Sequence, residues 1–236
     1  MVKGIYQASR SLDTRMKNMS IVANNLSNLN TTGFKRKVPF SEVLENEGKS
    51  KMKEIIDFRQ GELVPTEGNF DLAIEGEKIF FAIQTEDGPR FTRNGRFTLS
   101  EEGFLVDENG DSVLGKSGEI NIKSAMLNED QTVHITEAGE VRVGEILVDS
   151  VMLVKFEEPQ KLTNTSSSQF QIEGDAYEQA KENEYKVFQG YLEGANVNPI
   201  MEMESMINVN QDYTSAQKMI GFLDKSLGQA NEVGKV

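Results

Sequence analysis

The chain has 236 residues, a net charge of −13 and no cysteine, and its length suffices for one domain with appendages or for two small domains. The lack of cysteine excludes disulfides, thiolate metal sites and cysteine nucleophiles. No apolar run reaches the roughly 18 residues that a membrane span requires. Charged side chains interrupt the first residues, so we expect no signal peptide, and composition alone predicts a cytoplasmic protein.

Charge is distributed unevenly along the chain. Residues 1–40 hold seven basic side chains and one acidic side chain, a net charge of +6, which leaves −19 for residues 41–236. An acidic body with a basic arm suggests charge complementarity between chains. It argues against nucleic-acid binding, because the body would repel phosphate. The alternative is that the basic residues form only a solvated helix face.

The first predicted element is a helix that ends near Asn30. Its apolar residues recur at spacings of seven and three, and they are Ile5, Ala8, Leu12, Met19, Val22, Leu26 and Leu29. Such a heptad pattern is typical of helices that pack against a partner helix. At about 1.5 Å per residue the helix would be roughly 40 Å long. The pattern leaves open an amphipathic helix that closes on the core of its own chain.

A polar loop is predicted after this helix. It combines turn-forming residues with one aromatic and three basic side chains: Asn24, Asn25, Asn28, Asn30, Thr31, Thr32, Gly33, Phe34, Lys35, Arg36 and Lys37. Asparagine, threonine and glycine compete with helical hydrogen bonding, so the helix should end here. Residues 38–60 contain Pro39, Gly48 and many polar side chains, and they are predicted to form an irregular extension.

Residues 61–192 are predicted to form a mainly β domain. Apolar and polar residues alternate in short segments such as 71–84, 90–99 and 133–143, and glycine turns separate them. Residues 145–156 are expected to form one longer buried strand. Short strands joined by glycine turns indicate a compact sandwich or barrel.

Three groups of residues could suggest metal or catalytic chemistry, but each lacks the required pattern. Residues 107–111 (DENGD) resemble the start of a calcium loop, although the glycine stands too early and Gly118 occupies the place of the bidentate glutamate. His134 has no second histidine or cysteine with which to form a site. Glu101 and Glu102 are typical of a solvated turn rather than of a glycosidase pair. We therefore expect no enzyme activity, no cofactor and no metal site.

A second long helix is predicted to begin at Pro199, because proline suits the first helical position, and to end near Asn231. Its heptad residues are Met206, Val209, Tyr213, Ala216, Ile220, Leu223, Leu227 and Ala230. This helix would be roughly 50 Å long. The fold class is therefore α+β, with long terminal helices in a coiled-coil-like domain around a central, mainly β domain. Each helix is expected to pack against the other and against neighbouring copies.

Several segments resemble the bacterial flagellar axial proteins, the family of rod and hook subunits. Residues 24–36 (NNLSNLNTTGFKR) are similar to the N-terminal signature of that family, and residues 68–115 are similar to its central block. Residues 192–198 (LEGANVN) resemble its LEGSNVN motif, and residues 202–213 resemble its C-terminal EM…MI…Q.Y pattern. These matches occur in the family's order and cover most of the chain.

Small departures from the family pattern leave the subtype open. Ala195 stands where serine is more common, and Asp212 stands where arginine is common. The short segment between Lys37 and Gln60 resembles proximal-rod subunits more than distal-rod subunits. The alternatives are a distal-rod or hook-type subunit and, from a different class, a peptidoglycan- or carbohydrate-binding module with a helical dimerisation handle.

The resemblance implies a structural subunit of the flagellar basal-body rod that polymerises through its terminal helices. The chain would divide into a helical rod domain (1–37 and 193–236), an extension (38–60) and a central β domain (61–192). The implied partners are copies of the chain, other rod proteins, the flagellar type III export apparatus, and the hook and L/P-ring proteins. Nucleic acid and small-molecule substrates are not expected. The rod spans the periplasm, and the chain would be exported without cleavage of a signal peptide.

The expected assembly interface combines heptad residues with residues of the two signature motifs. It comprises Ile5, Leu12, Met19, Val22, Leu26, Leu29, Asn24, Asn25, Asn28, Gly33, Phe34, Lys35, Arg36, Asn196, Val197, Met206, Tyr213, Ile220, Leu223 and Leu227. The heptad residues would supply apolar packing, and the signature loop would set the angle between helix and body.

Overall fold

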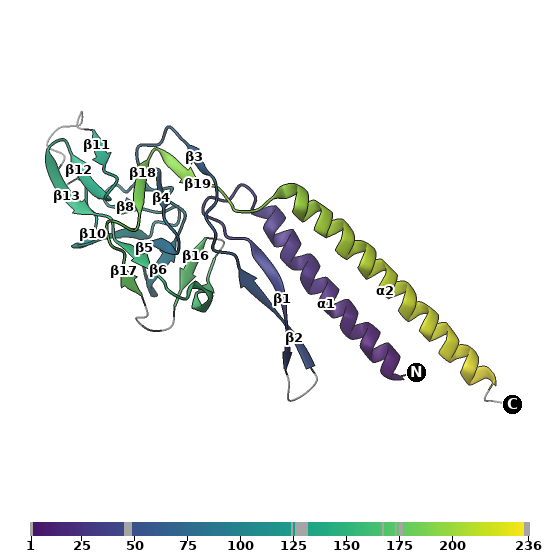
Figure 1. Cartoon of the computed structure of the whole chain (residues 1–236). Coiled ribbons are helices and arrows are strands. Elements are labelled where there is room, and N and C mark those ends of the chain that lie inside the picture. The colour runs from purple at the N-terminus through teal and green to yellow at the C-terminus, as the bar shows by residue number, and fades with distance from the viewer. Residues whose placement is uncertain are drawn as a thin grey trace. The chain divides into compact units, whose positions relative to one another are not determined.

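The structure is a computed structural model that describes residues 2–44, 49–123, 125, 132–166, 168–172, 174 and 177–233. The chain divides into two compact units. Unit 1 comprises residues 1–27, 37–56 and 197–236, and unit 2 comprises residues 28–36 and 57–196. Two terminal helices and a β-rich centre confirm the predicted α+β class (Figure 1).

Unit 1 contains two long helices that lie side by side, α1 (Val2–Ser27) and α2 (Pro199–Val233) (Figure 1). They run antiparallel, because the start of α2 lies beside the end of α1. Asn198 precedes α2, and its side-chain oxygen accepts hydrogen bonds from the backbone of Ile200 and Met201, at 3.0 and 3.2 Å. Such capping satisfies helix donors that have no intrahelical partner, and it explains why α2 begins at the predicted proline. The coiled-coil geometry stays a prediction.

A β-hairpin also belongs to unit 1, and it corrects the predicted irregular extension. Strands β1 (Lys37–Leu44) and β2 (Lys49–Ile56) pair antiparallel over their whole lengths, from Lys37 with Ile56 to Leu44 with Lys49. Continuous pairing satisfies the backbone polar groups of a two-stranded ribbon, whose side chains can stay polar. Polar composition therefore misled the prediction, because it reports burial rather than backbone pairing.

Unit 2 is built of short strands and one 3₁₀ helix. They are β3 (Leu63–Pro65), β4 (Leu72–Glu75), β5 (Ile79–Thr85), β6 (Gly88–Thr92), β7 (Thr98–Leu99), β8 (Leu105–Val106), β9 (Ser112–Gly115), β10 (Gly118–Glu119), β11 (Val133–Ile135), β12 (Glu140–Val143), β13 (Ile146–Ser150), β14 (Leu153–Lys155), η1 (Pro159–Lys161), β15 (Thr163–Asn164), β16 (Gln169–Gln171), β17 (Glu178–Gln179), β18 (Lys186–Gln189) and β19 (Tyr191–Glu193). In the described residues the largest sheet follows the order β15-β16-β6-β5-β9-β8-β7, and β10, β14 and β17 join it.

The core of unit 2 lies on both faces of β5. Ile79, Phe81 and Ile83 belong to one buried aliphatic cluster, whereas Phe80 packs edge-on against Phe58, Phe156 and Phe170 with ring centroids 5.5–5.8 Å apart. Successive side chains of a strand point to opposite faces, so this alternation places β5 between two apolar layers.

The longer strand predicted for residues 145–156 is two strands in different sheets. β13 pairs with β12, and β14 pairs with β5. Between them Val151 forms a bridge with Gly115 and donates its backbone N–H to Gly139 at 2.8 Å, so the chain changes sheets at this residue. The described helices include none that is long and apolar enough to cross a membrane.

Candidate assembly interface

Unit 1 places the predicted heptad residues on the shielded side of each helix. Val22 is buried, and the half-buried members are Leu12, Met19, Leu26, Met206, Tyr213, Ile220 and Leu223. The shielded side of α2 faces α1. Ile5 and Leu227 belong to the helices, but their side chains lie outside the described residues. The heptad residues therefore line the contact between α1 and α2 within one chain.

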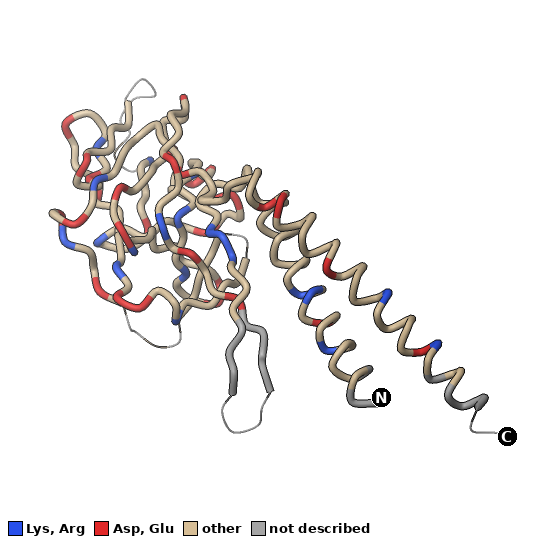
Figure 2. The backbone as a smooth tube through the Cα atoms, turned by 45° about the vertical axis from the view of Figure 1, so that its right-hand side comes forward, with Lys and Arg blue, Asp and Glu red and all other residues tan. Residues whose placement is uncertain are grey.

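Charge complements this apolar contact. Helix α1 carries four basic and one acidic residue, whereas α2 carries five acidic and two basic residues. Figure 2 shows basic residues along the described part of α1 and several acidic residues along α2. Arg15 of α1 forms an ion pair with Asp212 of α2. Both groups are partly exposed, so this pair selects the helix partner more than it stabilises the fold.

A buried polar cluster joins the signature end of α1 to the start of α2. The Asn25 amide donates to the backbone oxygen of Lys37 at 2.8 Å and accepts from the Lys37 backbone N–H at 2.9 Å. Its nitrogen also lies 3.2 Å from Oε2 of Glu202, whose side chain is fully buried. One asparagine thereby fixes the end of α1, the first residue of β1 and the first turn of α2. An aliphatic side chain could not replace it without leaving buried polar groups unpaired.

A second cluster lies in unit 2, where the signature loop meets the last strand. Gly33 donates its backbone N–H to the backbone oxygen of Glu193 at 2.7 Å. The φ angle of Gly33 is 68°, and a Cβ at this position would lie 2.4 Å from the backbone of Arg93. Only glycine tolerates both this conformation and this approach, which explains the glycine of the TTGF sequence.

Three charged side chains are buried together at this point. Lys35 Nζ lies 2.5 Å from Glu193 Oε1, and Arg93 Nη1 lies 3.1 Å from Glu193 Oε2. Lys35 also donates to the backbone oxygen of Arg59 at 2.8 Å, and Gly61 donates its N–H to Glu193 Oε1 at 3.0 Å. Each of the three side chains is about 1% exposed. One carboxylate therefore neutralises two buried cations, one from the signature loop and one from the β core.

The electrostatics of this triad depend on Glu193. Burial lowers the pKa of the Lys35 ammonium, and the adjacent Glu193 carboxylate opposes that shift. Burial likewise lowers the pKa of the Arg93 guanidinium, again opposed by Glu193. Arg93 additionally lies over the Phe80 ring, 5.5 Å from its centroid, and so connects the triad to the aromatic layer.

Asn196 completes the junction in unit 2. Its side-chain oxygen accepts the backbone N–H of Arg36 at 2.7 Å, and its side-chain nitrogen donates to the backbone oxygens of Asp57 and Arg59, both at 2.8 Å. This amide bridges three segments that are distant in sequence. The arrangement positions backbone segments, and its groups are engaged with one another rather than aimed at a substrate.

The predicted interface residues thus separate into two classes. Asn25, Gly33, Lys35 and Asn196 form buried junctions, while Phe34 is buried beside them. Asn24 is exposed, and the half-buried members are Leu29, Asn28, Arg36 and Val197. Residue types gave no means of predicting the partners Arg93, Glu193 and Glu202. Their only signal was that Glu193 and Glu202 lie in the two C-terminal motifs.

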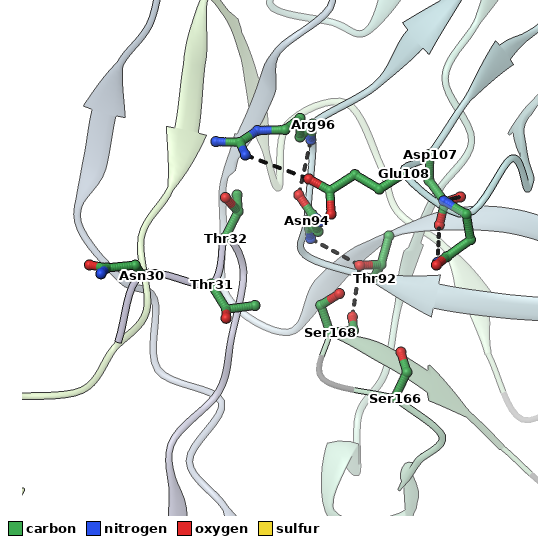
Figure 3. A pocket seen from close by; sticks show the side chains of 11 residues that line it. Asn30, Thr31, Thr32, Thr92, Asn94, Arg96, Asp107, Glu108, Ser166 and Ser168 are labelled. Carbon is green, nitrogen blue, oxygen red and sulfur yellow. Dashed lines mark hydrogen bonds and ion pairs between the residues drawn. The ribbon is translucent and has the colours of Figure 1, made fainter. Parts of the chain in front are cut away.

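A polar cavity of about 390 Å³ opens on unit 2 (Figure 3). Its lining is Asn30, Thr31, Thr32, Thr92, Asn94, Arg96, Asp107, Glu108, Asn109, Ser166 and Ser168. Much of this lining is already hydrogen-bonded internally: Asp107 accepts the backbone N–H groups of Asn109 and Asp111 at 2.8 and 3.0 Å, and Thr92 donates to Ser168 at 2.7 Å.

Ligand pockets are usually lined by apolar and aromatic side chains with a few polar groups that have free bonding capacity. The residues that line this cavity include no aromatic ring, and its carboxylate at Asp107 serves a turn. The cavity therefore gives no support to the carbohydrate-binding alternative, and the segment that resembled a calcium loop is an Asp-centred turn.

Comparisons with known proteins agree with this geometry. Three family models match the chain: "Flagella basal body rod protein" at residues 5–35, "Flagellar hook protein FlgE/F/G D1 domain" at residues 73–143, and "Flagellar basal body rod FlgEFG protein C-terminal" at residues 189–233. The first and last models contain the residues of the two buried junctions on either side of the β core.

Full-length relatives bear similar names. The flagellar basal-body rod protein FlgF of Caulobacter vibrioides is 33% identical, with 97% of this chain and 96% of the relative covered. FlgF of Rhizobium meliloti is 29% identical, with 96% and 97% covered. FlgG of Buchnera aphidicola from Baizongia pistaciae is also 29% identical, with 96% and 98% covered. The chain therefore belongs to the family of bacterial flagellar basal-body rod proteins, which are structural proteins rather than enzymes, and it is a rod subunit of the proximal, FlgF-like type.

Proposed function

We propose that the chain polymerises through α1 and α2 with copies of itself and with other rod proteins, and so builds the drive shaft that carries motor torque to the hook. The observation that carries this proposal is the exposure of large apolar side chains on α2. Ile200, Ile207 and Phe222 are 76%, 58% and 70% exposed, although α1 already covers the opposite side of the helix. An apolar face that the chain itself leaves open needs another molecule to cover it.

Torque transmission requires stiffness, and the two buried junctions supply it within each unit. Asn25 fixes both helices and the hairpin of unit 1, and Glu193 fixes the signature loop and the last strand of unit 2. Buried, fully engaged polar groups have few alternative arrangements, so they hold a segment in one position. Loss of a junction should therefore weaken the shaft more than any surface change.

The remaining partners and the route to the rod belong to the same proposal. The family implies export through the flagellar type III apparatus without cleavage of a signal peptide, and contacts with hook and L/P-ring proteins. The charged residues that interrupt the first segment, such as Arg10, Asp13 and Arg15, support an uncleaved N-terminus. Intact-mass measurement of the chain in isolated basal bodies tests this point, because removal of a signal peptide would lower the mass.

The assembly proposal is tested by placing charge in the helix contact. Leu26→Asp combined with Ile220→Asp should abolish swimming and incorporation into basal bodies, because an unpaired carboxylate in an apolar contact is costly. The β core should stay folded by circular dichroism. Leu147→Asp combined with Ile146→Asp is the matched control, since both residues are exposed on unit 2. A helix variant that still assembles and swims would sink the proposal.

A further inference from the structure

The side of α2 opposite α1, here called the outer face of α2, carries apolar residues in two separate segments. At 3.6 residues per turn, Ile200, Met203, Ile207, Met219 and Phe222 project to the side opposite Met206, Tyr213 and Ile220. They are between 52% and 76% exposed. Three of them form a start segment at 200–207, and the other two form an end segment at 218–225. Gln211 and Thr214 separate the segments with polar surface.

The two segments carry opposite charges. Glu204 lies within the start segment, and Lys218 and Lys225 flank the end segment. Figure 2 shows acidic residues near the beginning of α2 and lysines in its second half. All three side chains are exposed, and in the described part of the chain none of the three forms an ion pair. Each segment therefore combines an apolar patch with a charge that the other segment could neutralise.

One helix cannot bring its own two segments together. Their centres are about 17 residues apart, which is about 25 Å along a straight helix. Only a second copy can supply the complementary segment. Copies that point the same way without displacement would set Glu204 beside Glu204 and lysine beside lysine, which is unfavourable.

We propose that the start segment of the outer face of one copy docks on the end segment of a second copy, displaced along the helix axis by about 17 residues. This inference rests on the proposed function, because copies in a rod point the same way. The contact is heterologous: each copy offers a start segment to one neighbour and an end segment to another. Such a contact continues from copy to copy and forms an open array rather than a closed dimer.

Cysteine cross-linking tests the displacement directly, because the natural sequence has no cysteine. Basal bodies are isolated from cells whose only copy of the chain carries Met203→Cys and Met219→Cys, and a short bismaleimide is added. Dimers, trimers and larger products should form. Chains with either substitution alone should not cross-link to themselves. Leu147→Cys combined with Ile146→Cys, on the surface of unit 2, is the control and should give no ladder.

Two cross-linking results would overturn the proposal. Products that stop at the dimer would indicate an antiparallel, closed pair, which matches the same charges without displacement. Absence of products in basal bodies that contain the chain would mean that another molecule covers the outer face.

Charge exchange provides a second readout. Glu204→Lys alone, and Lys218→Glu with Lys225→Glu alone, should each reduce the cross-linked yield about two- to fivefold, the range expected for exposed charge pairs. Combining all three changes should restore the yield. If the combination stays as poor as either half, the displaced register is wrong.

These outcomes are separable from failure of the proposed function. The variant with Leu26→Asp and Ile220→Asp alters the contact between α1 and α2, so its continued assembly would contradict the rod function itself. If that variant fails to assemble while the charge exchange gives no rescue, the rod function stands and only the displaced contact is refuted.

Discussion

The two units of this chain treat their apolar and charged side chains in opposite ways. Unit 2 buries both faces of β5 and even encloses three charges, Lys35, Arg93 and Glu193. Unit 1 leaves residues such as Ile207 and Phe222 of α2 more than half exposed. A unit that has enclosed its own charges has a complete surface, whereas a helix that is apolar on two sides requires a further partner. The comparison separates what folds alone from what is completed by assembly.

The largest expected effect comes from Glu193→Gln, which removes the charge that neutralises Lys35 and Arg93. Leaving buried charges uncompensated should destabilise unit 2 by about 3–5 kcal/mol. Urea denaturation followed by circular dichroism measures this loss. The control is Glu62→Gln, because the Glu62 side chain is exposed and should matter by less than about 0.5 kcal/mol. Equal denaturation midpoints for the two variants would show that unit 2 does not depend on its buried charges.

A smaller effect is expected in unit 1 from Asn25→Ala. The change removes the hydrogen bonds to the backbone of Lys37 and to the buried Glu202 carboxylate, and such losses cost about 1–3 kcal/mol. Faster hydrogen exchange at the end of α1 and the start of α2 would report it. Asn24→Ala is the neighbouring control, since the Asn24 side chain is exposed. If both variants exchange alike, Asn25 does not fix the helices.

The smallest effect concerns Asp57, whose pKa is held below its ordinary value by hydrogen bonds from the Arg59 side chain. A carboxylate with a lowered folded pKa adds stability above its unfolded pKa, and that stability is lost as the pH falls through the folded pKa. Arg59→Gln should therefore lower the urea midpoint slightly near pH 7 and leave it unchanged near pH 2. A difference that persists at the lower pH would assign the effect to packing instead.

Sequence patterns predicted the elements whose cause is local. The spacing of Leu12, Met19 and Leu26 predicted α1, and Asn198 with Pro199 marked the start of α2. The glycine between β4 and β5 marked a turn that the structure confirms, because Gly76 adopts a φ of 153°. In each case a few neighbouring residues determine the backbone, so no distant contact is needed to infer it.

Long-range features escaped prediction for the same reason. Lys35 appeared as one member of a solvated basic triplet, yet it is buried because Glu193, 158 residues later, supplies its counter-charge. The paired β1–β2 hairpin was missed because polar composition gives no signal of strand pairing. The outer face of α2 was also missed, since the heptad pattern selects only one side of a helix that is apolar on two.

Hydrogen exchange of the purified full-length chain tests the central claim most directly. The account predicts slow exchange in β4 and β5, whose backbone groups are buried, and fast exchange along the described lengths of α1 and α2, whose outer surfaces await neighbouring copies. The contrast should diminish in chains assembled into basal bodies, where both helices become protected. Free chains in which α2 exchanges as slowly as β5 would contradict the account, because unit 1 would then be complete without assembly.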